Sequence, residues 1–309
     1  MKKNIINIIR HITLFILICT NINCGKNLIA DIPAYIEIQE FNYINNSENT
    51  KPYTSNYHST KITDAWVTMD GQFLGVFEIP CIIPIHLANN LQSSLHSFDI
   101  YPGIKVNGIS ATRAQYPFYE KFAIDTAIFR DSTVLLKPTT QYKDIAVDKF
   151  DGLGTFELKS EMILNTDSTM QISDCTNLSS SSATPIIQAD EVFQGESSLA
   201  IYLNNEQNYF HISSDTINLE GTTFLELNFK TTTTLKAGLI IVNSGKLQQK
   251  EELIQLHPTN IWKKTYLDIT HLINKGNNYS SFKIYFEGCG LNNSTNHIYI
   301  DNLKLMSRS

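Results

Sequence analysis

The chain has 309 residues, a formal net charge of −6 at pH 7 and 17% charged residues, fewer than most soluble domains carry. Its lysines and arginines form no cluster, and an acidic chain without a basic patch argues against nucleic acid as a partner. The length exceeds that of one typical domain and suffices for two well-formed hydrophobic cores.

The N-terminus has the pattern of an export signal. Lys2 and Lys3 precede an apolar run from Ile12 to Cys19, and a positive start followed by a short apolar stretch is typical of a secretory signal peptide. The run is too short to stay in a bilayer, because a membrane-spanning helix needs about 20 apolar residues. The sequence therefore predicts a signal peptide over residues 1–23 that is removed during export.

Cys24 lies at the far edge of this signal and resembles the lipid-accepting cysteine of bacterial lipoproteins. The resemblance implies that Cys24 becomes the first mature residue, carries palmitate-type acyl chains and begins a tether over residues 24–31. Because acyl chains hold a protein at a membrane, we expect a Gram-negative outer-membrane protein, with the periplasmic or surface face left open. The alternatives are a cleaved, soluble exported protein and a cytosolic protein.

Residues 32–147 are expected to form a small β-sandwich. Ala34–Phe41 alternates apolar and polar side chains, which is typical of a half-buried strand. Glycines directly after Asp70, Pro102 and Asn107 predict tight turns, because glycine adopts the positive φ that such turns need. The further predicted strands are Lys61–Met69, Phe73–Ile79, Ser97–Tyr101, Phe122–Phe129 and Thr133–Lys137.

Two stretches of this module, Ala65–Gly75 and His96–Gly103, resemble the PEGA-type repeat of bacterial envelope proteins. The resemblance implies a small transthyretin-like or immunoglobulin-like sandwich, and it brings no catalytic residues with it. We therefore expect a spacer near the anchor.

Residues 148–309 are expected to form a second β module with one helical turn at Ile269–Ile273. The predicted strands are Ser198–Tyr202, Phe210–Ser213, Phe224–Thr231, Ala237–Val242, Ile254–Leu256, Trp262–Asp268, Ser281–Phe286 and His297–Leu305. This number of strands suits a jelly roll. The expected fold class is thus all-β, with a small Ig/transthyretin-like sandwich followed by a jelly roll after a cleaved signal peptide.

Four segments of the second module resemble a galactose-binding-like, or carbohydrate-binding-module, jelly roll. They are Gly195–Leu199, Phe224–Thr231, Trp262–Asp268 and Ile298–Leu305. The resemblance implies the fold, and it implies a sugar ligand only loosely, because a fold does not fix a function.

The same resemblance implies a structural calcium ion, held by an acid near the first strand and an aspartate in the closing strand. Asp301 lies at the closing position, with Asp151 and Glu196 as candidate partners, since calcium takes carboxylate and carbonyl oxygens. The other interpretation is that Asp301 caps a turn or meets solvent. No other cofactor is expected, and the scattered histidines indicate no zinc site.

Tyr209, Phe210 and His211 form the most site-like cluster, because they follow a polar run. An aromatic surface beside polar groups suits sugar binding, so these three are the candidate contact residues. Tyr202 and Tyr285 are further candidates for an aromatic platform, although tyrosines are common in the strands of any sandwich.

Other chemically distinctive residues are expected to be buried. Trp66 and Trp262 lie in the interiors of predicted strands, where a core position is expected. Cys81, Cys175 and Cys289 follow the signal, and three cysteines cannot all pair internally. We interpret them as small buried hydrophobic residues, the alternative being one disulfide and one free thiol.

No reaction centre is indicated. The sequence contains no Gly-x-Ser-x-Gly elbow, no His-Glu-x-x-His and no phosphate-binding loop. Glu226, Glu251, Glu252 and Glu287 would form a glycosidase pair only if the fold brought two of them together, and we interpret them as exposed strand acids.

The sequence thus predicts a non-catalytic, outer-membrane-anchored lipoprotein that acts as a binding or scaffold module, and one version of this hypothesis is that it binds glycan. Its expected partners are the membrane, through the lipid, and either an outer-membrane β-barrel complex or a polysaccharide. One alternative is an accessory subunit of an outer-membrane β-barrel complex for protein export, assembly or nutrient uptake. The other is a glycan-active enzyme.

Overall fold

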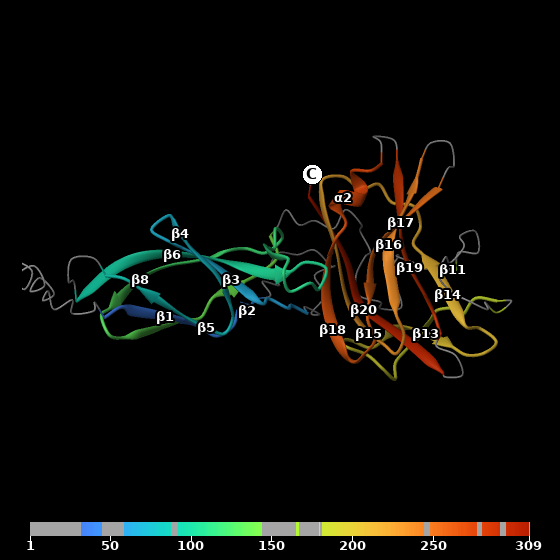
Figure 1. Ribbon diagram of the computed structural model, residues 1–309, viewed down its shortest axis with the longest axis horizontal. Helices are drawn as coiled ribbons and strands as arrows, with labels where there is room; N and C mark the ends of the chain where they lie inside the picture. The colour runs from blue at the N-terminus through green and yellow to red at the C-terminus, as the bar shows by residue number, and fades with distance from the viewer. Residues whose placement is uncertain are drawn as a thin grey trace, which may run out of the picture.

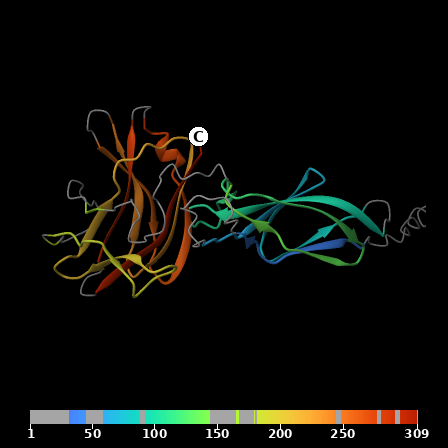
Figure 2. The ribbon, with the colours of Figure 1, turned by 180° about the vertical axis from the view of Figure 1, so that it is seen from behind.

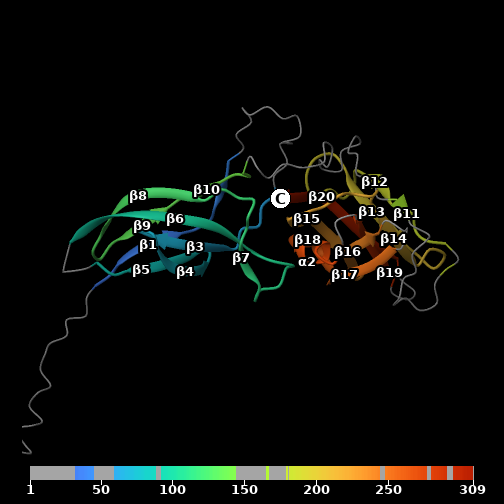
Figure 3. The ribbon, with the colours of Figure 1, turned by 90° about the horizontal axis from the view of Figure 1, so that it is seen from above.

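The computed structural model describes residues 32–44, 59–87, 92–143, 165–166, 179, 181–243, 248–276, 280–290 and 295–308. They form two bodies, and one end of the elongated first body abuts the side of the second, as Figures 1 and 3 show. The described residues up to 143 build the first sandwich, and those from 165 onward build the jelly roll, which confirms the all-β fold class. Within these ranges no helix has the length and apolarity needed to cross a membrane.

The first sandwich packs two sheets over one hydrophobic core. One sheet has the order β5 (Cys81–Ile85), β1 (Ala34–Ile38), β9 (Thr133–Leu136). The other has the order β4 (Gln72–Glu78), β3 (Asp64–Met69), β6 (Ser93–Lys105), β7 (Arg113–Gln115), and β8 (Phe122–Phe129) also pairs with β6. A short ladder joins β2 (Asn42–Tyr43) to β10 (Thr139–Thr140). Alternate side chains such as Ile36, Val67 and Phe98 point inward and are fully buried.

Two of the predicted turns are confirmed. Asp70 and Gly71, with φ of 51° and 77°, connect β3 to β4 in a tight hairpin. Asn107 and Gly108, with φ of 55° and 68°, follow the end of β6. Aspartate, asparagine and glycine tolerate this left-handed region better than other residues, which is why the sequence signal was reliable here.

The third predicted turn, at Pro102-Gly103, is wrong because β6 runs straight through both residues. Pro102 pairs with Ala65 on β3, and Gly103 pairs with Asp64. A Cβ atom on Gly103 would lie 2.8 Å from Asp64 Cβ and 2.9 Å from Trp66 Cδ1. This glycine therefore permits close side-chain packing within a strand.

The jelly roll packs two five-stranded sheets face to face, seen from behind in Figure 2. The β19 sheet has the order β11 (Asn165–Thr166), β14 (Tyr209–Ser213), β19 (Ser281–Cys289), β16 (Leu235–Val242), β17 (Gln248–Leu256). The β15 sheet has the order β12 (Ile186–Gln188), β13 (Ser198–Leu203), β20 (Asn296–Arg308), β15 (Thr222–Thr231), β18 (Thr259–Asp268). Each predicted strand of this module is present, and the predicted helical turn is α2 (Thr270–Ile273).

The cysteines follow the alternative interpretation. Cys289 is disulfide-bonded, so its interpretation as a small buried hydrophobic residue is wrong, whereas Cys81 is a free, half-buried thiol. Cys175 lies outside the described residues, as do Cys24, the signal peptide, the tether and the predicted boundary between residues 147 and 148.

Candidate functional site

The first sandwich and the jelly roll share a hydrophobic cluster at their contact. Its members in the first sandwich are Ile104, Tyr116, Phe118 and Tyr119, and those in the jelly roll are Phe224, Tyr266 and Met306. The ring of Tyr116 packs edge-on against Phe224, with centroids 5.4 Å apart, and lies 4.9 Å from the ring of Tyr266. Such aromatic contacts combine a large buried area with a preferred geometry. We call this contact and the polar groups around it the junction.

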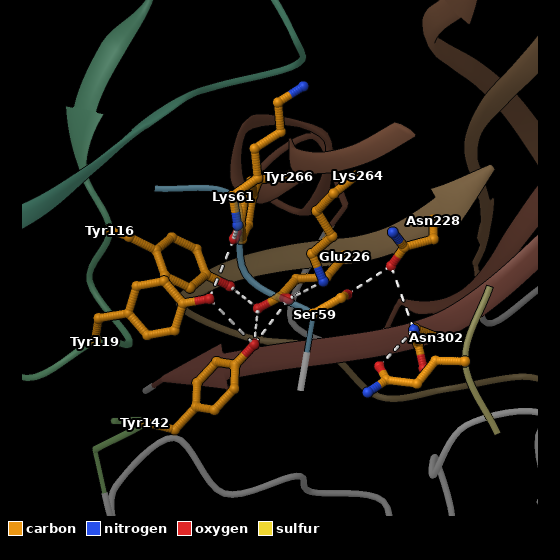
Figure 4. A network of polar contacts seen from close by, with 11 residues as sticks. Ser59, Lys61, Tyr116, Tyr119, Tyr142, Glu226, Asn228, Lys264, Tyr266 and Asn302 are labelled. Atoms are coloured by element: carbon orange, nitrogen blue, oxygen red, sulfur yellow. Dashed lines mark hydrogen bonds and ion pairs between the residues drawn. The ribbon is translucent and has the colours of Figure 1, made fainter. Parts of the chain in front are cut away.

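A buried carboxylate lies at the centre of the junction (Figure 4). Glu226 on β15 is fully buried and accepts a hydrogen bond of 2.5 Å from the Tyr116 hydroxyl. The Tyr142 hydroxyl lies 2.9 and 2.8 Å from the two carboxylate oxygens. Lys264 Nζ lies 2.6 Å from Glu226 Oε2. The ion pair thus belongs to the jelly roll, while phenol groups of the first sandwich donate further hydrogen bonds to the Glu226 carboxylate.

The charges in the junction fix its protonation state. Burial alone would raise the pKa of Glu226, but the charges of Lys264 and Lys304, with hydrogen bonds from Lys264 and Tyr116, lower it below the ordinary value. Burial, followed by the charge of Glu226, raises the pKa of Tyr116 well above its ordinary value. Glu226 is therefore an ionised acceptor and Tyr116 a neutral donor near pH 7.

Directional contacts surround this centre. The Asn107 backbone N–H donates to the Tyr266 carbonyl at 2.8 Å, and the Lys61 N–H donates to the Tyr266 hydroxyl at 2.9 Å. The Ser59 hydroxyl donates to Asn228 Oδ1 at 2.6 Å (Figure 4). Because each bond needs a specific geometry, the junction holds the two bodies in one relative orientation.

The predicted contact residues on β14 do not form one exposed surface. Tyr209 is half-buried, Phe210 is fully buried in the jelly-roll core, and His211 is 1% exposed. Successive residues of a strand point to opposite faces of the sheet, so Phe210 faces away from its two neighbours. The expectation of a shared aromatic contact surface at Tyr209, Phe210 and His211 is corrected accordingly.

His211 belongs to a buried polar cluster on the outer face of the β19 sheet. Its Nδ1 lies 3.0 Å from Glu287 Oε2, which also pairs with Lys250, and its ring stacks on Tyr285 with centroids 5.5 Å apart. Burial would raise the pKa of Glu287, but hydrogen bonds from His211 and Lys250 lower it. His211 Nε2, Tyr285 Oη and Glu287 Oε1 are buried without a hydrogen-bond partner, so this cluster is incompletely satisfied.

Asp301, the predicted calcium ligand, accepts hydrogen bonds from backbone amides. It is fully buried, and its Oδ2 lies 2.9 Å from the N–H nitrogen of Phe193 and 3.1 Å from that of Gln194. Burial raises its pKa in spite of these bonds. Glu196 is exposed, and Asp151 lies outside the described residues. Among the residues with described positions, no group of three or more His, Cys, Asp or Glu is placed to hold a metal ion, and the calcium site stays a prediction.

Sequence reasoning missed the junction. The expectation of exposed strand acids is wrong for Glu226 and Glu287, which are 0% and 1% exposed. Glu226 lies between Leu225 and Leu227, as a solvent-facing residue would, and a second module covers its face. The only signal was the number of tyrosines. The expected core position is also wrong for the tryptophans, because Trp66 and Trp262 are half-buried and belong to no core cluster.

Comparisons with known proteins show likenesses of fold alone. No family model matches the chain, and no curated protein matches it. A family 22 carbohydrate binding module of Clostridium thermocellum Xyn10B is 14% identical, with 41% of this chain and 83% of that chain covered and a TM-score of 0.30. A carbohydrate-binding module of the β-sandwich superfamily, described for promiscuous specificity, is 10% identical, with 79% and 85% covered and a TM-score of 0.35. The enzymatically active domain of bacteriophage CBA120 tailspike protein 4 is 14% identical, with 48% and 19% covered and a TM-score of 0.34.

Proposed function

We propose that this protein is a non-catalytic envelope lipoprotein in which the first sandwich supports a jelly roll that binds glycan. The junction carries this proposal, because apolar contacts and the hydrogen bonds from Tyr116 and Tyr142 to the buried Glu226 tie the jelly roll to its support. Domains with small, polar interfaces usually move relative to one another. Because the junction has an apolar centre, we expect it to restrict such motion. β1 begins at the end of the first sandwich remote from the jelly roll (Figures 1 and 3), so an anchor before residue 32 holds the jelly roll away from the membrane.

The anchor is tested at Cys24. We expect the N-terminal peptide of the envelope protein to carry acyl chains on Cys24, and the protein to fractionate with the outer membrane. The Cys24→Ser variant should then accumulate in soluble or unprocessed form. Mass spectrometry that finds an unmodified N-terminus on cytosolic protein would refute the lipoprotein assignment.

The positions of the buried acids support binding without cleavage. Glu226 and Glu287 occupy the outer faces of opposite sheets, with the jelly-roll core between them. Packed sheets lie about 10 Å apart, whereas the two carboxyls of a glycosidase act across roughly 5–9.5 Å. Each carboxylate also forms an ion pair with a lysine. These two acids therefore cannot work as a pair on one glycosidic bond.

Affinity electrophoresis tests the binding role. The purified full chain is run through gels that contain xylan, mannan, galactan or β-glucan, and we expect retardation by at least one of them without release of reducing ends. Unchanged mobility in every gel would remove glycan binding from the proposal. Release of reducing ends would remove its non-catalytic part.

A second candidate role is an accessory subunit of an outer-membrane export, assembly or nutrient-uptake complex. It is favoured by large apolar side chains on the first sandwich: Leu95, Ile82, Phe129 and Leu135 are 72%, 61%, 51% and 47% exposed. Exposed apolar surface often marks protein contacts. Extraction with mild detergent should co-purify a β-barrel with the parent protein, and the double change Leu95→Ser and Phe129→Ser should reduce its yield. Recovery of the parent as a lone monomer would count against this role.

A further inference from the structure

The outer face of the β15 sheet divides into two halves. One half, with Phe224, Glu226 and Tyr266, is covered by the first sandwich. The other half carries five aromatic side chains in successive ring contact, which we call the aromatic platform: Phe193, Tyr202, Trp262, His297 and Tyr299. They come from three strands of the sheet and from the loop that precedes β13.

Tyr299 on β20 lies at the centre of the platform. The ring centroids of Trp262, Tyr202 and His297 are 6.3, 6.2 and 5.1 Å from that of Tyr299. Phe193 extends the row beyond Trp262, with centroids 5.8 Å apart. Tyr299 is 9% exposed, whereas Phe193 and Tyr202 at the two ends are each 40% exposed. The rings therefore form one continuous surface that is open to solvent at its ends.

Strand register places these rings on one face. Tyr202 on β13 pairs with His297 on β20, and Tyr299 pairs with Ala200 on one side and with Lys230 on the other. Directly opposed residues of neighbouring strands point to the same face of a sheet. The small side chain of Ala200 leaves room beside Tyr299, so that the neighbouring rings can spread over the sheet.

A neutral polar pair accompanies the rings. Glu191 Oε1 lies 3.1 Å from Trp262 Nε1 and 2.8 Å from Lys230 Nζ. The hydrogen bond from Lys230 lowers the pKa of Glu191, so the carboxylate is charged and its charge is balanced by Lys230. The pair thus offers carboxylate oxygens as acceptors and ammonium protons as donors, and its two charges balance each other. The further negative charge of Asp190, which acts on Tyr299, disfavours an anionic ligand.

We propose that the aromatic platform binds a neutral glycan chain, with the C–H faces of its sugar rings stacked on Trp262, Tyr202 and Phe193. Ligand sites of this kind combine aromatic walls with a few polar groups that fix orientation, and Glu191 and Lys230 supply those groups for sugar hydroxyls. The inference rests on the proposed glycan-binding role and locates it on the outer face of the β15 sheet, beside the junction.

Tryptophan fluorescence tests the site directly, because the chain has only two tryptophans. In the full-chain Trp66→Phe variant, Trp262 is the sole tryptophan, and the neutral polysaccharide that retards the parent should shift its emission. Trp262→Ala and Tyr202→Ala should each weaken retardation by about tenfold in Kd, which is the loss expected for one stacking contact. Trp66→Phe, which alters a half-buried tryptophan on the first sandwich, should leave retardation unchanged.

The outcomes separate this inference from the proposed function. Retardation that persists in both Trp262→Ala and Tyr202→Ala, with no emission shift in Trp66→Phe, would place the glycan elsewhere and overturn the inference while the glycan-binding role stands. Failure of every polysaccharide to retard the parent would overturn both. Because Tyr202 is an exposed end of the platform, its variant retains the fold, which circular dichroism checks, and so keeps the test decisive if Trp262→Ala is unstable.

Discussion

Glu226 of the jelly roll accepts a 2.5 Å hydrogen bond from Tyr116 of the first sandwich, and the two side chains are 0% and 2% exposed. Each group satisfies the other across the contact between modules. If the modules separated, the Glu226–Lys264 pair would lose its phenol donors and the aromatic cluster would meet water. The stability of each module is therefore coupled to the presence of the other.

The Tyr116–Glu226 bond predicts the effect of removing one oxygen. Tyr116→Phe keeps the ring packing but deletes the donor, and a hydrogen bond to a charged group is worth about 1.5–3 kcal/mol. We expect the free energy of unfolding to fall by that amount in urea titrations of the full chain.

Tyr285→Phe is the matched control. Tyr285 is also fully buried, but its hydroxyl has no hydrogen-bond partner. Deleting that hydroxyl should change the free energy of unfolding by less than about 1 kcal/mol, because no protein hydrogen bond is lost. Equal losses in Tyr116→Phe and Tyr285→Phe would contradict the assignment of the junction bond.

The junction should also respond to acid. The pKa of Glu226 is lowered from its ordinary value of 4.5, so its ionised form stabilises the folded state fully above that pH. The stabilisation is lost as the pH falls through the lower, folded-state pKa. Glu226→Gln leaves Lys264 buried without its counter-charge and should cost about 3–5 kcal/mol at neutral pH. Urea titrations from pH 7 to pH 3 should show this difference shrinking below pH 4.5, and a difference that stays constant would refute the prediction.

Gly238 on β16 predicts a steric effect at the His211 cluster. A Cβ atom there would lie 2.7 Å from Tyr285 Cε1 and 2.8 Å from its hydroxyl, and would also meet the Glu251 carbonyl. Gly238→Ala should therefore displace the β17 backbone at Glu251 as well as Tyr285 and cost about 1–3 kcal/mol, as overpacking does. Gly290→Ala is the control, since its nearest neighbour would be 3.3 Å away. Calorimetry of the two variants should show a clear difference in melting temperature, and similar values would argue against the strained contact.

Asp301 predicts how the protein responds to calcium. The Asp301 carboxylate accepts hydrogen bonds from the backbone N–H groups of Phe193 and Gln194. Asp301→Asn replaces this carboxylate oxygen with a weaker carbonyl acceptor or an NH₂ group that cannot accept, and should lower the free energy of unfolding by about 1–3 kcal/mol. A loss that is the same in calcium and in EDTA would indicate that Asp301 acts through these amides alone. A parent protein that melts higher in calcium, with no such rise in Asp301→Asn, would instead establish the calcium site.

The strands of the jelly roll were predictable because local pattern and tertiary environment agree. In Phe224–Thr231 the apolar positions at Leu225, Leu227 and Phe229 face the core, as the alternation requires. The Pro102-Gly103 signal failed because it has two physical uses. The glycine at position 103 avoids a collision with Asp64 and Trp66, and a single sequence does not distinguish that role from a turn.

The sites were less predictable because they depend on which sheet faces are covered. Glu226 and Tyr202 both occupy outward positions of the β15 sheet, and each lies between two apolar residues in the sequence. Glu226 is nevertheless buried under the first sandwich, whereas Tyr202 is 40% exposed. The aromatic platform joins residues more than a hundred positions apart, from Phe193 to Tyr299, and strand order decides that they meet. Periodicity within one strand contains no such information.

The uninterrupted course of β6 determines the length of the first sandwich. The 13 residues of β6 rise about 3.3 Å each, or roughly 40 Å in all. At one end Ser93 pairs with Phe129, and just beyond the other end Val106 forms a bridge to Tyr266 of the jelly roll. Under the proposed anchoring before residue 32, the length of this strand adds to the distance between the bilayer and the platform. The aromatic rings would then be presented to chains that extend away from the headgroups.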